Sequence, residues 1–506
     1  MMESMAEQNK AADTQHVNSS ASPVELDAAP TARRSGDLSS ATSPNRVLAI
    51  VSVGMILANL DLFVVNVALP TIALDFGSPS LERLSWILNG YTIAYAALLV
   101  FFGRLSERYP RNVSFLVGIA AFTAASAACA AATGTEMLVV FRVVQAAAAA
   151  LMTPTSLGLL LAAFPPEGRS GAVRTWTAVG GLAAALGPLI GGVLVTASWR
   201  WIFLVNLPLG LITLVVGWRK LPRIPGHNSS HPHFGAALLV TAGVASLVFA
   251  IVKVNDWGWH SPGISAACAA TVIFLGWFVA HCLRSSDPFI DPHLFRIRPF
   301  TGAALAIAPG TAAFGALLLS MVLWDQMIWG WSALKIGLAM APGPLLIPVV
   351  SLLFSRRLIA RFGVAAVCAA GTISFALGLV WWAVMPGLEA SFLVATIGML
   401  PIGLGAGLLS PTLMGVSTSS LPPSSFATGS GAINMIRQVA IAVGVAVLVA
   451  ILGEHHAVEE WVQAFRVAWW IMAAVTLIGL VPTLLFIGPS AGTKIDIRQA
   501  TQQQTP

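Results

Sequence analysis

Fourteen long apolar stretches constrain this chain more than any other feature of its sequence. Each has about 20 residues, enough for a helix to cross a hydrocarbon core of roughly 30 Å. Because lipid offers no partners to backbone N–H and C=O groups, such stretches cross as helices. Only 9% of the residues are charged, against about 25% in soluble domains. We therefore predict an all-α integral membrane protein, with spans at the rounded limits 47–74, 84–102, 113–133, 136–163, 171–196, 201–218, 235–252, 264–282, 301–323, 335–354, 364–384, 391–414, 427–452 and 465–487.

The charges between the spans predict which side each connection faces. With both termini inside, the basic connections fall on one side, as the positive-inside rule expects for the cytoplasm, and the opposite side is mainly acidic. We expect a multi-pass protein of the cell inner (plasma) membrane, with a disordered cytoplasmic tail at 1–45 and a second cytoplasmic tail at 489–506. The net charge of +6 does not indicate nucleic acid as a partner, because the basic residues are spread along these connections.

Two long polar connections divide the spans into groups. "RKLPRIPGHNSSHPH" at 219–233 and "RSSDPFIDPHLFRIRP" at 284–299 isolate the seventh and eighth spans. The connection after the second span, "GRLSERYPRN", resembles the one after the tenth, "SRRLIARFGV", which indicates duplicated bundles related by an axis along the membrane normal. We predict an N-terminal six-helix bundle at 46–218, cytoplasmic linkers with two inserted transmembrane helices at 219–300, and a C-terminal six-helix bundle at 301–488.

Seven motifs follow one another along the chain. They are "LDLFVVNVALP" (60–70), "GRLSERYPRN" (103–112), "RVVQAAAAA" (142–150), "LGPLIGG" (186–192), "WRWIFLVNLPLG" (199–210), "WGWHSP" (257–262) and "NMIRQVAIAVGVA" (434–446). With these motifs the chain resembles the major facilitator superfamily, specifically its fourteen-helix drug:proton antiporter family of the EmrB/QacA type. The resemblance implies two six-helix bundles with two inserted helices between them, and proton-coupled export of drugs or other amphipathic small molecules by alternating access.

Asp61 is the one residue that can carry a charge in the apolar stretch between Arg46 and Asp75. Gly54 and Ala58 precede it at helical spacing, so the carboxylate lies on a face of small residues. An ionised carboxylate in lipid costs roughly 2.5 to 3.5 kcal/mol, so we expect Asp61 to face the protein interior as a proton-coupling group. The alternative is a salt bridge that only holds helices together.

Arg142 is a second charge inside a span, and the resemblance implies that it takes part in proton coupling. Arginine stays charged at any useful pH, so its approach or withdrawal changes the proton affinity of a nearby acid. The alternative is an arginine that snorkels from its helix end to the membrane interface. Gln145, on nearly the same face, and Asn66, in the first span, are further candidates for coupling or substrate binding.

Glycines surround a proline in the fifth span. Gly187, Gly191 and Gly192 permit close helix contact, and Pro188 permits a bend. The resemblance identifies these residues as the antiporter motif of exporters. The alternative is a packing face with no bearing on the direction of transport.

The connection after the second span is expected to form a short gating loop. The resemblance implies a latch between the two bundles, although Glu107 stands in place of the usual aspartate and Pro110 in place of a usual glycine. The positive charge of the loop fixes topology in either case. The residues assigned to the latch are Gly103, Glu107, Arg108 and Arg111.

Polar residues in the C-terminal spans are also candidates for coupling or substrate binding. Arg437 and Gln438 lie deep in the thirteenth span, where an arginine needs an acidic or carbonyl partner. Asp325 lies at the outer end of the ninth span, and its alternative is a place at the membrane interface. Because aromatic walls suit amphipathic or cationic ligands, we assign Phe63, Tyr91, Tyr95, Phe314 and Trp324 to a substrate cavity.

The sequence indicates neither an enzyme nor a cofactor or metal site. It has no GxxxxGK phosphate loop, so the proton gradient is the expected energy source. "EHHAVEE" at 454–460 has ligand-like spacing but lies in a short external connection, so no metal is assigned to it. The expected partners are a small-molecule substrate, protons and membrane lipid; the substrate and the oligomeric state stay open. Three rival functions also stay open: an exporter dedicated to one metabolite or antibiotic, a proton-coupled uptake transporter and, least favoured, a membrane enzyme or sensor.

Overall fold

A computed structural model of the chain describes residues 43–77, 80–225, 234–285, 288–421, 426–453 and 457–487. All the regular elements within these ranges are helices. They include fourteen spans that are long and apolar enough to cross a membrane, which confirms the predicted all-α class. The tails assigned to 1–45 and 489–506 lie outside the described residues, except for 43–45, where the first helix begins.

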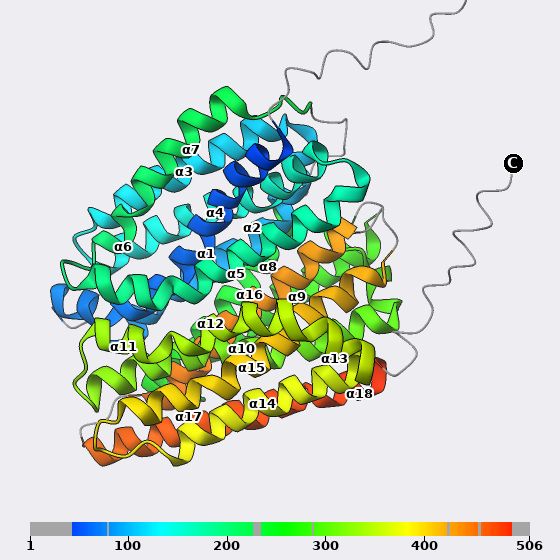
Figure 1. Cartoon of the computed structure of the whole chain (residues 1–506). Coiled ribbons are helices and arrows are strands. Elements are labelled where there is room, and N and C mark those ends of the chain that lie inside the picture. Colours follow the sequence, from blue (N-terminus) through cyan, green and yellow to red (C-terminus); the bar gives the residue numbers. More distant parts are fainter. Residues whose placement is uncertain are drawn as a thin grey trace, which may run out of the picture. The chain divides into compact units, whose positions relative to one another are not determined.

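The N-terminal half supplies the first six spans, drawn in blue to green in Figure 1. The sixth span is divided at Val205, because Pro208 lacks an amide hydrogen and interrupts the helical hydrogen bonds. The helices are α1 (Pro44–Asp75), α2 (Leu81–Arg108), α3 (Arg111–Ala130), α4 (Thr135–Ala163), α5 (Pro166–Val195), α6 (Trp201–Leu204) and α7 (Asn206–Lys220).

The C-terminal half supplies the last six spans. Its tenth span is interrupted by Pro342, Pro344 and Pro348, and a π-helical turn follows the last of them. The elements are α10 (Arg298–Met327), α11 (Ala333–Met340), α12 (Pro342–Val349), η2 (Val350–Phe354), α13 (Ser355–Phe362), α14 (Val364–Val384), α15 (Phe392–Ser419), α16 (Phe426–Leu452), α17 (Val458–Ile478) and α18 (Leu480–Phe486).

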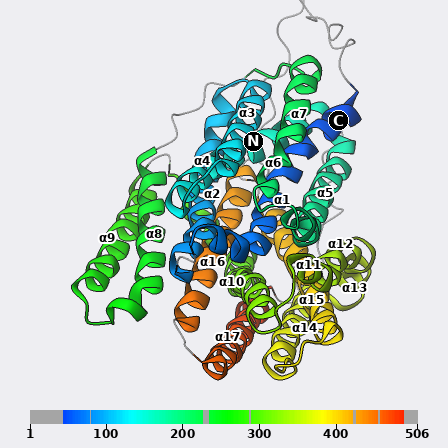
Figure 2. The ribbon, with the colours of Figure 1, turned by 90° about the vertical axis from the view of Figure 1, so that its left-hand side faces the viewer.

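Two helices and a short 3₁₀ turn connect the halves: α8 (Phe234–Trp257), α9 (Pro262–Arg284) and η1 (Pro292–Arg296). Helix α8 packs on α9 and also on α2 and α16, so the pair lies at one edge of the bundle, as Figure 2 shows. Large apolar side chains of α9 such as Val272 and Trp277 are exposed. In a membrane protein these side chains face lipid.

The same helix contacts recur in the two halves. Helix α1 packs on α5 and α3 on α4, while α10 packs on α16 and α14 on α15. The halves meet where α2 packs on α16 and where α5 packs on α11 and α12. These recurring contacts are those of a duplicated bundle, and the residue limits of the two bundles stay a prediction.

Several helices extend beyond the apolar stretches that predicted them. The second span was expected at 84–102, but α2 runs from Leu81 to Arg108. Its N-terminus is capped by the Ser80 side chain, which accepts a hydrogen bond from the Arg83 amide at 3.4 Å. Its other end is set by Pro110, not by the end of the apolar run. Helix limits therefore follow capping and proline residues, which hydropathy does not detect.

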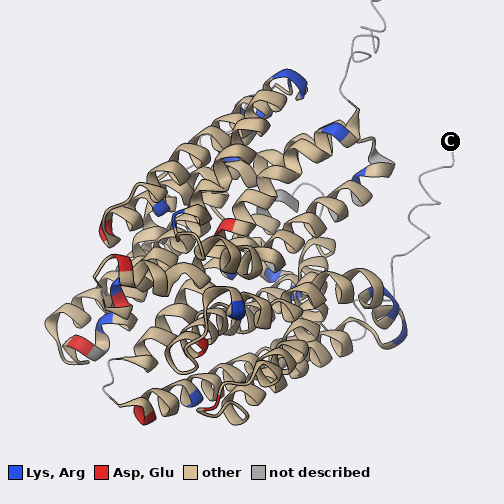
Figure 3. Cartoon of the chain, turned by 60° about the vertical axis from the view of Figure 1, so that its left-hand side comes forward, with Lys and Arg blue, Asp and Glu red and all other residues tan. Residues whose placement is uncertain are grey.

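Charged residues lie at opposite ends of the helices according to their sign. Figure 3 shows most Lys and Arg residues gathered at one end and most Asp and Glu residues at the other. We call these the basic end and the acidic end. Asp75 and Glu82 flank the first connection at the acidic end, and Arg108 and Arg111 flank the second at the basic end.

Candidate functional site

The middle of α1 carries a fully buried acid. Asp61 has 0% of its side chain exposed. Small residues on the same helix allow the neighbouring helices to come this close: a Cβ on Gly54 would lie 2.9 Å from the ring of Phe115 in α3. Burial of an acid inside the bundle, as the sequence predicted, keeps its carboxylate away from lipid.

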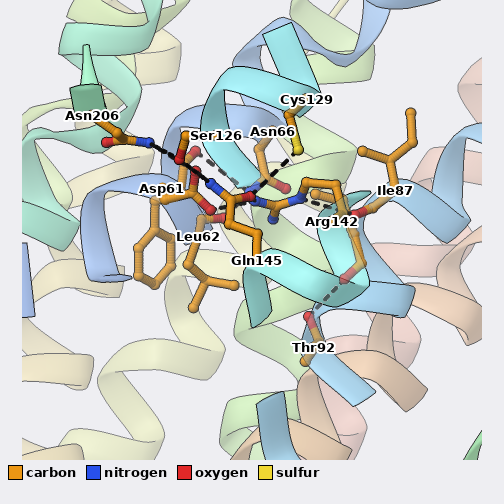
Figure 4. Close-up of polar contacts among 12 residues, drawn as sticks. Asp61, Leu62, Asn66, Ile87, Thr92, Ser126, Cys129, Arg142, Gln145 and Asn206 are labelled. Atoms are coloured by element: carbon orange, nitrogen blue, oxygen red, sulfur yellow. Dashed lines mark hydrogen bonds and ion pairs between the residues drawn. The ribbon is translucent and has the colours of Figure 1, made fainter. Parts of the chain in front are cut away.

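Arg142 of α4 forms an ion pair with Asp61, and its side chain is also fully buried (Figure 4). Its Nε donates a hydrogen bond to the Ile87 carbonyl oxygen at 3.4 Å, and its guanidinium lies 4.0 Å from the ring centre of Tyr91. The expected alternative, an arginine that snorkels to the interface, is wrong for this structure. Arg142 instead joins α4 to both α1 and α2.

Polar side chains from three further positions complete the site. The Gln145 amide donates to Asp61 Oδ1 and to Ser126 Oγ, each at 2.8 Å, and its own oxygen accepts from Arg142 at 2.8 Å. Asn206, the first residue of α7, donates to Asp61 Oδ1 and to Ser126 Oγ, each at 3.3 Å. Residues of α4 and α7 thus meet at the carboxylate of α1, and Ser126 of α3 accepts hydrogen bonds from two of them.

This arrangement has two distinct charge states. With Asp61 ionised, the carboxylate accepts hydrogen bonds from Arg142, Gln145 and Asn206. With Asp61 protonated, the charge–charge attraction to Arg142 disappears, and the guanidinium is left buried with the Gln145 amide oxygen, the Ile87 carbonyl and the Tyr91 ring, none of which carries a charge. A buried charge without its counter-ion costs several kcal/mol, so protonation of Asp61 would remove a large part of what stabilises Arg142 at this position.

The sequence did not identify Ser126 or Asn206. Asn206 lies in the motif "WRWIFLVNLPLG", and Ser126 is a polar residue within the alanine-rich α3. Asn66, a candidate for coupling or substrate binding, makes no hydrogen bond to Asp61 among the contacts of the described residues. Its amide donates to the Leu62 and Phe63 carbonyl oxygens of its own helix, at 3.3 and 3.5 Å.

The glycine-rich motif of α5 makes backbone contacts on two sides. A Cβ on Gly187 would lie 2.7 Å from Phe63 Cβ in α1, and one on Gly191 would lie 3.0 Å from the Val64 carbonyl oxygen. A Cβ on Gly192 would lie 2.6 Å from the Ala333 carbonyl oxygen at the start of α11. The motif is therefore a packing face, and one of its contacts joins the two halves at the acidic end.

The residues assigned to a gating loop lie mainly in helices. Gly103 and Arg108 belong to the last turns of α2, and Arg111 is the first residue of α3. The expectation of a loop over these residues is wrong, because nothing before Pro110 interrupts α2. Arg111 donates to the Gly158 carbonyl oxygen of α4 at 3.1 Å. The side chain of Glu107 is outside the described part of the chain, and the latch stays a prediction.

The polar candidates of the C-terminal half have few partners. Arg437 donates to Asn434 Oδ1 at 3.3 Å, so its partner is an amide carbonyl of its own helix. Gln438 Oε1 is buried without a hydrogen-bond partner among the described residues. Asp325 is fully buried near the end of α10, and both carboxylate oxygens likewise lack a partner within the described ranges. Asp325 thus lies near a helix end, as the interface alternative expects, but its side chain is enclosed by protein.

The five aromatic candidates separate into three groups. Tyr91 stacks on Tyr95 with ring centres 6.0 Å apart, beneath Arg142. Phe63 of α1 and Phe314 of α10 meet edge to face across the two halves, at 6.1 Å. Trp324 is fully buried against α17, so it does not line an open cavity in this conformation. A substrate-binding role for all five stays a prediction.

Known proteins resemble this chain over most of its length. The model of the Major Facilitator Superfamily matches residues 51–445. A probable actinorhodin transporter of Streptomyces coelicolor is 34% identical, over 79% of this chain and 71% of that protein. A methylenomycin A resistance protein of Bacillus subtilis is 30% identical, over 91% of this chain and 98% of that protein. A tetracenomycin C resistance and export protein of Streptomyces glaucescens is 31% identical, over 81% of this chain and 75% of that protein.

Solved structures show the same fold at low sequence identity. A peptide transporter in complex with sulfate superimposes with a TM-score of 0.66 at 15% identity, over 88% of this chain and 94% of that one. The human organic anion transporter MFSD10 superimposes with a TM-score of 0.58 at 16% identity, over 87% of this chain and 99% of that one. Together with the family match and the fourteen spans, these findings show that the chain belongs to the major facilitator superfamily, as a transporter of the fourteen-helix drug:proton antiporter type and not an enzyme.

Proposed function

We propose that the protein is a secondary antiporter that exports drugs or other amphipathic small molecules across the plasma membrane in exchange for protons. Its basic end and both termini face the cytoplasm. The observation that carries the proposal is the ion pair between Asp61 and Arg142, buried completely and shared by α1 and α4. Buried ionisable residues inside membrane spans are rare and mark proton or substrate pathways.

The charge states of Asp61 supply the coupling step. A proton that reaches Asp61 releases Arg142 from its counter-ion, and the two halves rock about the central site to restore a satisfied arrangement. Loss of the proton on the other side restores the pair. A transmembrane potential assists any step that moves net charge, by about 2.3 kcal/mol per charge per 100 mV.

Relatives support export as the direction. One is named as a probable actinorhodin transporter, one as a methylenomycin A resistance protein, and one as a tetracenomycin C resistance and export protein. The α5 glycine motif also agrees with export, because the resemblance identifies it as the antiporter motif of exporters. Proton-coupled uptake is the competing direction, and it would accumulate substrate in intact cells rather than deplete it.

A dedicated exporter of one compound is a second candidate. The names of the actinorhodin, methylenomycin and tetracenomycin relatives each refer to a single compound, which favours this narrower function. A substrate panel distinguishes the two candidates. Several chemically unrelated substrates support a multidrug exporter, and one supports a dedicated exporter.

Proton release from vesicles tests the coupling. The protein is reconstituted in vesicles with an acid interior, lipophilic cations and neutral antibiotics are added, and proton efflux is recorded for the natural chain and for Asp61→Asn. We expect substrate-dependent efflux with the natural chain and none with Asp61→Asn, because the amide cannot exchange a proton. The matched control is Asp75→Asn, at the exposed end of the same helix, which should transport normally.

A second variant keeps this test conclusive if Asp61→Asn folds poorly. Asp61→Glu retains an exchangeable acid and should retain proton efflux, measured after size-exclusion chromatography has confirmed a folded protein. Unchanged transport and proton release in a folded Asp61→Asn protein would show that Asp61 is structural.

A further inference from the structure

A second buried acid lies at the acidic end of the C-terminal half. Asp325 stands two residues before Met327, the last residue of α10, and none of its side chain is exposed. Its backbone carbonyl accepts a hydrogen bond from the Trp331 amide at 2.9 Å, so the connection to α11 folds back over the helix end. Its two carboxylate oxygens have no partner among the residues that the structure describes.

Tryptophans surround this end of α10. Trp324 lies 5.2 Å from Trp469 between ring centres, and Trp329 lies 4.8 Å from Trp331. Trp382 contacts both Trp329 and Trp469. We call these five residues the tryptophan cluster. They exclude water from the helix end, and the indole N–H groups of Trp324, Trp331 and Trp382 are buried without an acceptor in the described ranges.

No counter-ion for Asp325 is present within the described part of the chain. Helices α15 and α18 carry no titratable residue. Lys335 of α11 lies over the Trp331 ring, and Arg466 of α17 donates to the Pro386 carbonyl. None of the ion pairs found in the described ranges includes Asp325. The remaining titratable groups on α10 and on the elements packed against it are Arg298 on α10, Arg46, Asp61 and Asp75 on α1, Arg437 on α16, Glu459 and Glu460 on α17, and His293 and Arg296 on η1.

An ionised carboxylate is not stable in such surroundings. A buried charge needs an opposite charge, hydrogen-bond donors or water, and a carboxyl group without them is stable as the neutral acid. We propose that Asp325 binds a proton at the acidic end of the C-terminal half and releases it only when that end opens to water. The proposal rests on the alternating access of the proposed function, and it adds a proton-binding group distinct from Asp61.

The proposal links the proton to one conformational step. In this conformation α5 and α11 are in backbone contact at the acidic end, where a Cβ on Gly337 would lie 2.5 Å from the Pro188 carbonyl oxygen. Closing that end buries Asp325 and takes up one proton from the solution on the same side; opening it returns the proton there. Because one proton is bound on closure, the ratio of open to closed protein rises with pH, by up to about tenfold per pH unit.

Infrared spectroscopy tests the bound proton directly. The full chain in lipid nanodiscs is measured at pH 7, where exposed carboxyl groups are ionised, and the C=O band of protonated carboxyl groups is compared between variants. We expect Asp325→Asn to lose the intensity of one protonated carboxyl. The matched control, Glu389→Gln, changes an exposed acid at the same end and should lose none. An unchanged band in Asp325→Asn overturns the proposal.

Tryptophan fluorescence tests the linkage to opening. Acrylamide quenching of the full chain is measured against pH, because opening exposes the tryptophan cluster. We expect quenching to rise with pH in the natural chain and in Glu389→Gln, and to stay at its low-pH value in Asp325→Asn, whose amide imitates the neutral acid and preserves the fold. Identical pH profiles for the natural chain and Asp325→Asn overturn the linkage.

Neither measurement uses a transported substrate. A chain that holds the Asp325 proton but releases no protons with drug keeps this proposal and loses the proposed function. A chain that releases protons when drug is added, but shows no protonated carboxyl at Asp325, keeps the proposed function and loses this proposal.

Discussion

Each half of the molecule buries one aspartate completely, and the two carboxyl groups differ in everything around them. Asp61 accepts hydrogen bonds from Arg142, Gln145 and Asn206, whereas no described residue donates to Asp325. Both are inaccessible to water in this conformation. The difference teaches that burial alone does not determine what an acid in a membrane span can do. Hydrogen-bond donors around Asp61 stabilise its ionised form, so Asp61 can exist both ionised and protonated. Without such donors among the described residues, Asp325 favours the protonated form.

The largest loss of stability is expected from a substitution of Arg142, because this residue is the counter-ion that Asp61 has and that Asp325 lacks within the described part of the chain. Arg142→Met leaves the Asp61 carboxylate buried without its counter-ion, which should lower the free energy of unfolding by about 3–5 kcal/mol. Asp325→Asn, which removes no partner, should leave the unfolding midpoint unchanged. Denaturant unfolding of the purified chain in detergent measures both.

The control for Arg142→Met is Arg200→Met, which breaks the half-exposed pair with Asp75. A loss at Arg142 no larger than the loss at Arg200 would contradict the interpretation. The double variant Asp61→Asn with Arg142→Gln should recover part of the stability, because no charge is then left unpaired.

An intermediate effect is expected where the two halves meet between α5 and α11. Gly337→Val places a branched side chain against the Pro188 carbonyl of α5, and overpacking of this kind costs typically 1–3 kcal/mol. The substitution destabilises the conformation in which the acidic end is closed. The tryptophan cluster should therefore become more accessible to acrylamide, and the infrared band of the protonated carboxyl should weaken. The Asp61 pair should persist, because it lies within the N-terminal half.

Gly181 offers the matched control for this prediction. It lies in the same helix α5 as Pro188, but a Cβ there meets no atom within 4 Å. Gly181→Val should therefore leave quenching unchanged. Equal quenching in the two variants would show that the α5–α11 contact does not close this end.

Sequence reasoning recovered the fold because hydropathy reports it directly. A run of about 20 apolar residues can satisfy its backbone in lipid only as a helix, so the number and order of the spans followed from the positions of the apolar runs along the chain. The limits of the helices did not follow from it. Capping by Ser80 and interruption by Pro110 set the limits of α2, and Pro208 divided the sixth span.

The sites were recovered unevenly. The cost of charge in lipid singled out Asp61 and Arg142, but 81 residues separate them along the chain, and only the packing of α1 on α4 shows that they meet. Ser126 and Asn206 were missed because a short polar side chain in a span is ordinarily satisfied by its own backbone, as Asn66 is. Whether a buried acid has partners, which separates Asp61 from Asp325, depends on tertiary contacts that one sequence does not contain.

The smallest expected effect concerns the aromatic support beneath Arg142. The Tyr91 ring lies 4.0 Å from the guanidinium, while its hydroxyl has no described hydrogen-bond partner. Tyr91→Phe should therefore leave stability and coupling unchanged, because the ring face is kept. Tyr91→Leu removes the cation–π contact and should cost about 0.5–2 kcal/mol. The contact between Tyr91 and Arg142 lies within the N-terminal half, so the infrared band of Asp325 should be the same in both variants. Denaturant unfolding and drug-dependent proton efflux measure the effect, and equal losses from Tyr91→Phe and Tyr91→Leu would show that the hydroxyl, not the ring, supports the site.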